Sequence, residues 1–549
     1  MSELPALPID AYGAATHEVF NQPVELVDAN LFTSDRALAE GVNREGAGWA
    51  ANDLARHGGR LGQAATLELG ALANRFPPEL DTHDRYGRRV DLVRFHPAYH
   101  ALMELAVEEG LHASPWTEPR PGAHVARAAR FYMQTQVEAG HLCPITMTFA
   151  ATQSLKLAPK LAADWLPKIH ARAYDPRNVP AAEKSGLTIG MAMTEKQGGS
   201  DVRANTTRAT PIGADAYTLF GHKYFVSAPM SDAFLTLAQA PGGLTCFLAP
   251  RWRPDGTKNA IELIRLKRKM GNLSNASSET EWRGALAWRI GEEGRGVSTI
   301  IEMVAMTRFD CIVGSSGGMR AAVVQAIDHC RQRSAFGAKL VDQPIMLAVL
   351  ADLSLEAEAA LLLSLRLARA LDEGESELLR IALPLGKYWV CKRTPAHAYE
   401  AMECLGGSGF MEDSPLPRLY REAPVNAIWE GSGNIQCLDV LRALQRTPAT
   451  RDALFQEIEA ARGADATLDA ETRALAQALD DLPSFESRAR ELCDRMAVAL
   501  QASLMLRFAP EANARAFVSS RPAARGARHF GALAPGFNLR AIVERAAAR

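Results

Sequence analysis

A glutamate beside a tryptophan and a glycine-rich turn is the residue best suited to acid–base chemistry. Glu430 stands in the run Ile428-Trp429-Glu430-Gly431-Ser432-Gly433-Asn434, just before a predicted helix. Apolar neighbours raise the pKa of a carboxyl group toward the range that suits a general base. The alternative is structural, because an acidic side chain at the start of a helix interacts favourably with the helix dipole.

Two other stretches are polar and rich in glycine. The first is Ala192-Met193-Thr194-Glu195-Lys196-Gln197-Gly198-Gly199-Ser200-Asp201. The second is Glu403-Cys404-Leu405-Gly406-Gly407-Ser408-Gly409-Phe410, followed by Asp413, Arg418 and Glu422. Glycine lets backbone N–H groups approach a ligand closely, and the hydroxyls of Thr194 and Ser200 can hydrogen-bond to it. Taken alone, the first stretch predicts either a ligand-binding loop or an ordinary turn.

Two weaker patterns suggest other chemistry. Gly314-Ser315-Ser316-Gly317-Gly318 spells the Gly-x-Ser-x-Gly nucleophile motif of hydrolases. That motif needs a preceding strand of a parallel sheet, whereas its surroundings here read as helix, so close helix packing is favoured. His96 and His100 have the spacing of a helical metal pair, but no carboxylate ligand is near and Pro97 opens a helix. We therefore expect no metal site.

The elements that must position these residues divide the chain by texture. Residues 1–186 are predicted to be helical, and residues 187–292 hold short alternating runs typical of a small antiparallel β domain. Residues 293–446 return to long amphipathic segments, around 320–333, 345–371 and 376–403. Residues 447–549 form an extra helical, Arg-rich region. This order predicts an α+β fold with the sheet in its own domain.

Composition limits the class of protein. The formal net charge of the 549 residues is -2, so no global basic field attracts nucleic acid or anionic lipid. The N-terminus has neither a signal nor a transit pattern, and no stretch is long and apolar enough to span a membrane. The eight cysteines are scattered without a C-x-x-C pair, which indicates reduced thiols. We expect a cytoplasmic protein with no membrane partner.

Together the motifs resemble the acyl-CoA dehydrogenase superfamily. The first glycine-rich stretch, through Ala204, fits every position of that family's first signature, and Glu403–Glu422 fits every position of the second. Two multi-position matches in the right order are highly specific. The resemblance extends to about Gln445. It implies an N-terminal helical domain, a middle β domain and a C-terminal helical bundle, with FAD as cofactor.

The resemblance also assigns cofactor-binding roles. Met193 and Thr194 would lie along the flavin ring, with Gly199 and Ser200 near the pyrophosphate. Phe225, Val226 and Ser227 correspond to the segment covering the other face of the ring. The element Arg333-Ser334-Ala335-Phe336-Gly337, with Gln343, would hold the FAD of a neighbouring subunit, which implies a homo-oligomer and usually a tetramer. Further cofactor contacts are expected from Glu403, Gly407, Ser432 and Asn434.

Glu430 occupies the position of the catalytic base in most members of the family. It would take the α-proton of an acyl-CoA while the β-hydride passes to the flavin. Hydrogen bonds to the thioester carbonyl, one from a backbone N–H, would stabilise the developing enolate. Trp429 would restrict the acyl pocket to short or branched chains. Arg308 falls where many members place an active-site arginine, and a helix-anchoring ion pair is its alternative role.

A narrower resemblance is to the AidB branch of the superfamily, which belongs to the bacterial response to DNA alkylation. It rests on six motifs: Phe20-Asn21-Gln22-Pro23, Arg44-Glu45-Gly46-Ala47-Gly48-Trp49, Gln136-Val137-Glu138-Ala139-Gly140, Cys143-Pro144-Ile145-Thr146-Met147-Thr148-Phe149-Ala150-Ala151-Thr152, Met306-Thr307-Arg308-Phe309-Asp310 and Ile428–Gly433. The branch implies tight FAD binding, weak dehydrogenase activity and binding of double-stranded DNA through the C-terminal region. The arginines expected to contact phosphate are Arg442, Arg521, Arg525 and Arg528. A solvated surface is the alternative for them.

The sequence is compatible with three alternative functions. The first is an acyl-CoA dehydrogenase that passes electrons to an electron-transfer flavoprotein. The second is an acyl-CoA or nitroalkane oxidase, whose reduced flavin reacts fast with oxygen. The third is a DNA-binding protective flavoprotein with vestigial dehydrogenase activity.

Overall fold

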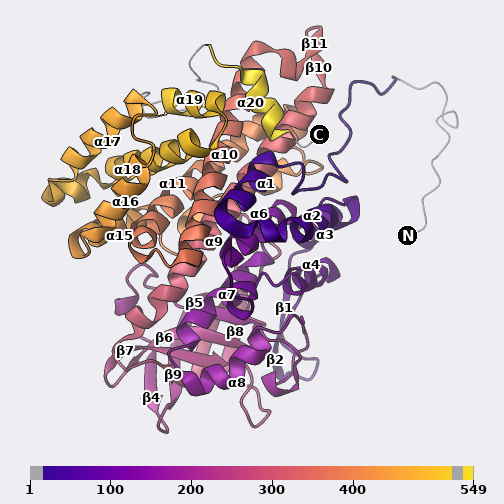
Figure 1. The fold of residues 1–549 in the computed structure, drawn as a ribbon. Helices are drawn as coiled ribbons and strands as arrows, with labels where there is room; N and C mark the ends of the chain where they lie inside the picture. Colours follow the sequence, from indigo (N-terminus) through magenta and orange to yellow (C-terminus); the bar gives the residue numbers. More distant parts are fainter. Residues whose placement is uncertain (1–16, 522–535, 548–549) are drawn as a thin grey trace.

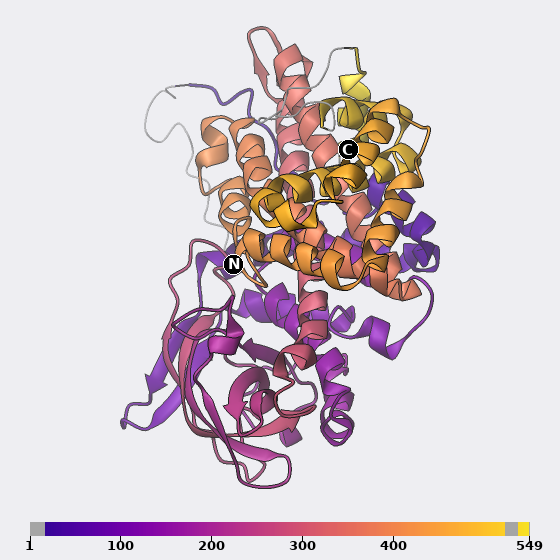
Figure 2. The ribbon, with the colours of Figure 1, turned by 90° about the vertical axis from the view of Figure 1, so that its left-hand side faces the viewer.

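The computed structural model describes residues 17–521 and 536–547. Helices gather at one end of the molecule and a sheet at the other, and α9 (Gly296–Gln332) leads from the sheet into the helices (Figure 1). A view turned by 90° shows the same separation (Figure 2). The predicted α+β class, with the sheet between two helical parts of the chain, is confirmed.

The N-terminal part is mainly helical. Its helices are α1 (Arg36–Val42), α2 (Ala51–Leu61), α3 (Ala64–Arg75), α4 (Pro97–Glu108), α5 (Ser114–Thr117), α6 (Ala123–Val137), α7 (Leu142–Leu155) and α8 (Pro159–Ile169). An antiparallel hairpin of β1 (Glu79–His83) and β2 (Arg89–Arg94) interrupts them. The sequence did not predict this hairpin, because its strands are short and highly charged. His96 caps α4 by accepting a hydrogen bond from the Ala98 N–H at 3.2 Å.

Seven strands form the middle sheet: β3 (Ile189–Ala192), β4 (Arg208–Pro211), β5 (Ala216–Ser227), β6 (Ala233–Ala240), β7 (Gly243–Pro250), β8 (Ile261–Leu266) and β9 (Ser277–Ile290). Their order is β3-β6-β4-β5-β9-β7, with β8 on β9 and a further pairing of β6 with β7. Most neighbours are antiparallel, as the alternating runs predicted. The exceptions to the predicted antiparallel pattern include β3, which runs parallel to β6.

Long helices build the C-terminal bundle. α10 (Pro344–Glu373) opens on a proline and ends before Gly374, whose φ of 69° suits a helix stop. α11 (Ser376–Glu403) has the predicted bounds. Short helices then lead toward the Glu430 turn: α12 (Gly407–Phe410), α13 (Leu416–Glu422) and α14 (Val425–Ile428). The longer α15 (Gly433–Arg446) follows that turn.

The C-terminal region continues this bundle. Its helices are α16 (Ala449–Glu459), α17 (Ala466–Ala478), α18 (Phe485–Phe508), α19 (Glu511–Ser520) and α20 (Leu539–Ala546). One buried apolar cluster contains residues of the N-terminal helices, α10, α11, α16 and α18, for example Leu54, Leu361, Leu385, Leu454 and Leu500. The region is therefore packed into the same helical body. Within the described residues, no helix is both long and apolar enough to cross a membrane.

Candidate active site

Glu430 lies in a sharp turn between α14 and α15. Its backbone φ is 55° and that of Gly431 is 97°, so two successive residues adopt the left-handed conformation. Glycine adopts it freely, but for glutamate it costs about 1 kcal/mol and persists only where the surroundings enforce it. We call Trp429–Gly431 the base loop.

Side chains from three helices hold the carbonyl groups of the base loop. Lys387 on α11 donates to the carbonyl oxygens of Trp429 and Gly431, at 2.6 and 2.5 Å. Gln436 on α15 donates to the oxygens of Glu430 and Gly431, at 3.0 and 2.8 Å. Arg308 on α9 adds a hydrogen bond of 3.1 Å to the oxygen of Glu430. All three consecutive carbonyl groups are thereby fixed from inside the protein.

The Glu430 carboxyl group has its own partner. Its Oε2 accepts a hydrogen bond of 2.7 Å from the Thr307 hydroxyl on α9. The backbone N–H of Glu430 has no acceptor among the described residues. The base loop thus offers a carboxyl group held at one oxygen and an unused N–H donor on the same residue.

Arg308 takes the structural role that the sequence left open for it. Its Nη1 lies 2.6 Å from Asp439 on α15, and its side chain is almost fully buried. Arg380 pairs with the other oxygen of Asp439 at 2.8 Å. Burial favours the neutral acid, but the charges of Arg308 and Arg380 outweigh it and lower the pKa of Asp439. Arg308 therefore anchors α15 and the base loop to α9.

Trp429 is fixed by a chain of polar contacts. Its indole N–H donates to Asn426 at 3.0 Å, and Asn426 donates to the Ser315 hydroxyl at 3.1 Å. Ser315 and Asn426 line a narrow pocket with Glu138, Gly318, Thr394 and Arg418. The hydrolase alternative is wrong, because Gly314–Gly318 lie inside α9 and Ser315 donates to the Cys391 thiol.

The predicted flavin residues of the middle domain come together at the sheet. Thr194 and Phe225 form an isolated antiparallel bridge, and the Tyr224 N–H donates to the Thr194 oxygen at 2.7 Å. Phe225 is 48% exposed, whereas Val226 is buried. Met193 and Thr194 are half-buried, and Gly199 and Ser200 are exposed. A Cβ at Gly199 would come within 2.6 Å of the Thr194 hydroxyl, so a larger residue there would displace the Thr194 side chain. The segment presents an aromatic face beside free hydroxyls.

Cys143 on α7 connects this segment with the base loop. Burial raises the pKa of its thiol to about 12, and the charge of Glu430 adds to the rise, while hydrogen bonds to Ser227 and Asn275 oppose it. Ser227 itself lies 3.2 Å from the Ser277 hydroxyl. Cys143 therefore lies beside Ser227 and within electrostatic range of Glu430. This position of Cys143 was not predicted from the sequence.

Other predicted cofactor residues lie elsewhere. Phe336 is at the turn of a hairpin of β10 (Ser334–Ala335) and β11 (Ala338–Lys339), at the end of α9 far from the sheet (Figure 1). Arg333 directly precedes β10, and Gln343 is the N-cap of α10. Because α9 has 37 residues, it is about 55 Å long at 1.5 Å per residue. Phe336 is 102% exposed at the tip. The Gln343 amide donates to Ala335 and Arg333 to Asn21.

The remaining residues that were predicted to contact the cofactor lie at helix ends. Glu403 ends α11, and Gly407 is the exposed first residue of α12. Ser432 is the N-cap of α15, directly after the base loop. Asn434 is exposed and accepts a hydrogen bond of 2.9 Å from Arg490 on α18, so the C-terminal region contacts this turn.

The predicted DNA-contacting arginines differ in their surroundings. Arg442 is exposed on α15. The prediction for Arg521 is corrected, because its buried guanidinium pairs with Asp352 and Glu356 of α10 at 2.8 and 2.9 Å. Arg521 thus stabilises the fold and is not free to contact phosphate. Arg525 and Arg528 lie outside the described residues.

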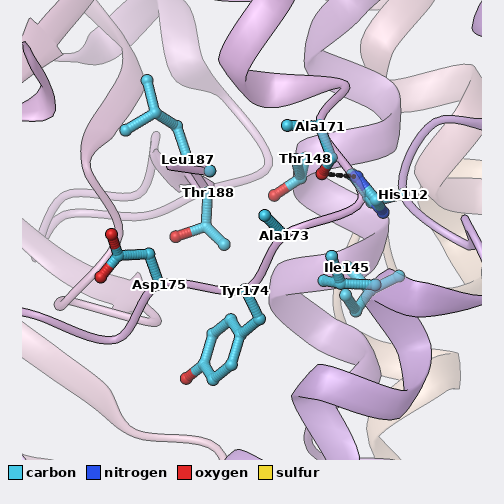
Figure 3. Close-up of a pocket in the computed structure, with 11 residues that line it drawn as sticks. His112, Ile145, Thr148, Ala171, Ala173, Tyr174, Asp175, Leu187 and Thr188 are labelled. Carbon is cyan, nitrogen blue, oxygen red and sulfur yellow. Dashed lines mark hydrogen bonds between the residues drawn. The ribbon is translucent and has the colours of Figure 1, made fainter. Parts of the chain in front are cut away.

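A second pocket lies in the N-terminal half of the molecule, between α7 and the segment leading to β3 (Figure 3). Its walls include His112, Thr148, Tyr174 and Leu187, and His112 bonds to the Ala171 oxygen at 3.0 Å. Burial lowers the pKa of His112 to about 4, so the ring is neutral at pH 7. None of the predicted site residues lines this pocket.

Family models match most of the chain. Residues 21–176 match the adaptive response protein AidB N-terminal domain, residues 190–284 match the acyl-CoA dehydrogenase middle domain, and residues 294–445 match the acyl-CoA dehydrogenase C-terminal domain. The three matches follow the order of the helical, sheet and helical parts described above.

Individual relatives are similar over nearly the full length. The AidB protein of Escherichia coli (strain K12) is 49% identical over 508 residues, which cover 91% of this chain and 94% of that protein. Acyl-CoA dehydrogenase family member 11 of Caenorhabditis elegans is 31% identical over 78% of this chain and 72% of its own. The crystal structure of Caenorhabditis elegans ACDH-11 in complex with C11-CoA superimposes with a TM-score of 0.84, at 28% identity and 94% coverage of both chains.

Proposed function

The chain belongs to the acyl-CoA dehydrogenase family, in its AidB branch, and on that premise we propose that it oxidises a short or branched acyl-CoA with Glu430 as the base. The observation that carries the proposal is the base loop. It holds a carboxyl group and, on the same residue, a backbone N–H that finds no acceptor in the part of the chain that the structure describes. These are the two groups that removal of a proton next to a thioester requires.

FAD is the cofactor of this family, and the residues at the sheet fit it. The half-exposed Phe225 ring can lie against a flavin face, and Thr194 and Ser200 offer hydroxyl groups at a backbone kept open by Gly199. Phe225, Ser227, Thr194 and Ser200 are the residues that we propose hold it, with Ser432 and Asn434 at the start of α15. Bound FAD supplies the acceptor for the β-hydride.

The groups of this chain then divide the work of proton removal. Glu430 takes the α-proton, and the electron pair of the broken C–H bond spreads onto the thioester oxygen. The N–H of Glu430 donates to that oxygen and stabilises its growing negative charge. Thr307 holds the carboxyl group in place through Oε2. Arg308, Lys387 and Gln436 hold the backbone and do not touch the substrate.

The acyl group is proposed to be short or branched because the bulky indole of Trp429, held by Asn426, directly precedes Glu430. The similar Caenorhabditis elegans ACDH-11 carries C11-CoA, which makes chain length a sharp test. We expect kcat/KM for isobutyryl-CoA or butyryl-CoA to exceed that for undecanoyl-CoA. A clear preference for the long chain would refute the role of Trp429.

The base is tested by anaerobic mixing with a short acyl-CoA. Wild-type protein is expected to lose its flavin absorbance, while Glu430→Gln retains FAD but is not bleached, because an amide cannot accept the proton. Bleaching of Glu430→Gln at the wild-type rate would assign the base elsewhere. Slow reoxidation of the reduced protein by oxygen would favour an electron-transfer flavoprotein as the acceptor, and fast reoxidation would favour an oxidase.

A homo-oligomer, most simply a tetramer, follows from the same proposal. The hairpin with Phe336 is about 55 Å from the sheet along α9, so it would serve the FAD of a neighbouring subunit. The eight cysteines are free thiols, in keeping with the cytoplasmic location that we propose.

Double-stranded DNA is the second candidate ligand, supported by membership of the AidB branch and by the exposed Arg442. If DNA binding is the main function, the protein protects DNA and its dehydrogenase activity is vestigial. Duplex affinity should fall with salt, and Arg442→Ala with Arg525→Ala and Arg528→Ala should reduce the slope by about 0.9 per lost phosphate contact. Arg521→Ala is the control, because it should lower stability instead. Unchanged affinity in the assembled triple variant would exclude these three arginines.

A further inference from the structure

A lysine buried beside the base loop is an unusual feature of this site. Lys387 is 1% exposed, and no carboxylate lies within salt-bridge distance of it in the described residues. Its ammonium group donates instead to the carbonyl oxygens of Trp429 and Gly431. Burying an ammonium group without a carboxylate is costly, so these two carbonyl dipoles are its main compensation.

The titratable groups that face Lys387 are the thiols of Cys311 on α9 and Cys391 on α11, and the charge of Glu430 also acts on Cys311. Burial raises the pKa of both thiols, although the charge of Lys387 opposes the rise. The thiols are therefore neutral at pH 7. The positive charge acts on the base loop without a thiolate to cancel it.

The contact with Trp429 also orients the N–H of Glu430. A trans peptide directs its C=O and N–H to opposite sides, and no peptide bond in the described residues is cis. Because Lys387 binds the oxygen of the Trp429–Glu430 peptide, the N–H of that peptide points away from α11. This is the N–H that has no acceptor in the described residues.

We propose that Lys387 is a positioning residue that orients and polarises the Trp429–Glu430 peptide, so that its N–H stabilises negative charge on the thioester oxygen of the substrate. The inference rests on the proposed function, because it concerns the same site. When the α C–H bond breaks, the proton moves to Glu430 and the electron pair to the thioester oxygen. A cation on the opposite end of the peptide strengthens the N–H as a donor at that moment. Gln436 and Arg308 hold neighbouring carbonyl groups but not that of Trp429.

Acetoacetyl-CoA is the probe that isolates this effect. It enolises without hydride transfer, so the pH at which it ionises when bound to the FAD-loaded protein reports how well the site stabilises an enolate. Wild-type protein should lower that ionisation pKa below the value in solution. Lys387→Met should raise it by about one pH unit, a tenfold loss of stabilisation. Its kcat should fall about tenfold or more, with KM within about threefold, since only charge in the transition state is affected.

Two companion variants separate charge from packing. Lys387→Gln keeps a hydrogen-bond donor and loses the charge, so it should behave like Lys387→Met, and it replaces that variant if the methionine form does not fold. Lys184→Met removes another buried lysine. The ammonium group of Lys184 lies 2.7 Å from Asp232 and does not contact the base loop. Lys184→Met should lower stability but leave the ionisation of bound acetoacetyl-CoA unchanged.

The outcomes distinguish the inference from the proposed function. Wild-type ionisation of bound acetoacetyl-CoA in both Lys387→Met and Lys387→Gln would overturn the role of Lys387 and leave Glu430 as the base. If wild-type protein neither lowers that pKa nor is bleached by a short acyl-CoA, the proposed function itself fails. A shift of equal size in Lys184→Met would show a general loss of packing and would also overturn the inference.

Discussion

The base loop and the tip of the β10–β11 hairpin share one backbone conformation but differ in what surrounds it. Glu430 and Gly431 have φ values of 55° and 97°, and Phe336 and Gly337 have 52° and 83°. In each pair a bulky residue adopts the left-handed conformation before a glycine. Lys387, Arg308 and Gln436 fix the carbonyl groups of the first turn. The ring of Phe336, by contrast, is fully exposed.

The difference indicates which of the two turns has all its stabilising contacts within one chain. The strain at Glu430 is offset by hydrogen bonds that the chain itself supplies, so the base loop can work in a single subunit. Phe336 and Gly337 form the two-residue turn between the paired residues Ala335 and Ala338, but the Phe336 ring itself is exposed. An exposed aromatic residue held in a costly conformation is typical of a contact with another molecule. We expect the exposed ring of Phe336 to be covered only when a second copy of the chain binds to the hairpin.

Among the variants of the two turns, removal of the Arg308 side chain should lower kcat the most. Arg308→Met deletes a hydrogen bond to the Glu430 carbonyl and the buried partner of Asp439. A displaced base lowers the rate on the order of a hundredfold, and kcat for a short acyl-CoA should show it while FAD stays bound. Arg380→Met is the matched control, because Arg380 also pairs with Asp439 but does not touch the base loop. Equal kcat values for the two variants would contradict the account.

Removing the exposed ring should act on the other turn alone. Phe336→Ala should weaken FAD retention about thirtyfold if the ring is an anchor between subunits, and should shift the oligomer toward smaller species. Equilibrium dialysis of FAD and light scattering measure both effects. Ile212→Ala, at another exposed apolar side chain, should change neither. Normal FAD retention and assembly in Phe336→Ala would show that the hairpin is not an interface.

Removing the Thr307 hydroxyl, which binds the Glu430 carboxyl group, should lower kcat less than removing the side chain of Arg308, which holds the backbone of the base loop. Thr307→Val removes the hydrogen bond of 2.7 Å to Glu430 Oε2, which should lower kcat about tenfold with little change in KM. Thr307→Ser should restore most of the loss, because the hydroxyl returns. A valine variant with wild-type kcat would mean that Thr307 does not hold the carboxyl group.

The smallest effect is expected at the base of the hairpin. Asn21 donates to the Ser334 oxygen at 2.8 Å and accepts from the Ser334 N–H at 2.7 Å. Asn21→Ala should loosen the hairpin and weaken FAD retention about threefold. Hydrogen exchange of the 334–339 amides measures the loosening. Exchange as slow as in the wild type would show that Asn21 does not secure the hairpin.

The sequence predicted the elements whose signals are local. The bounds of α11 were predicted from residues within that segment, and Glu430 was identified from its neighbours in the Trp-Glu-Gly run. The β1–β2 hairpin was not predicted, because short charged strands lack the alternating apolar pattern. Gly314–Gly318 gave a false signal instead. The run matches the hydrolase nucleophile motif, but its residues lie within a helix.

Contacts between distant segments could not be predicted in this way. Lys387 precedes the base loop by 42 and 44 residues, and Arg521 follows its carboxylate partners by 165 and 169. Nothing near Lys387 in the sequence marks it as different from a surface lysine. The Arg-rich tail likewise suggested DNA contacts for Arg521, because the sequence cannot show that Asp352 and Glu356 already bind it.

The most direct test of the central claim is exchange of the α-proton, which requires the base but not net oxidation. Wild-type protein with bound FAD is incubated anaerobically with isobutyryl-CoA in D2O, and deuterium at the α-carbon is measured by mass spectrometry. We expect the wild type to incorporate deuterium, Thr307→Val to do so more slowly, and Glu430→Gln to incorporate none. Incorporation by Glu430→Gln at the wild-type rate would contradict the role of Glu430 as the base.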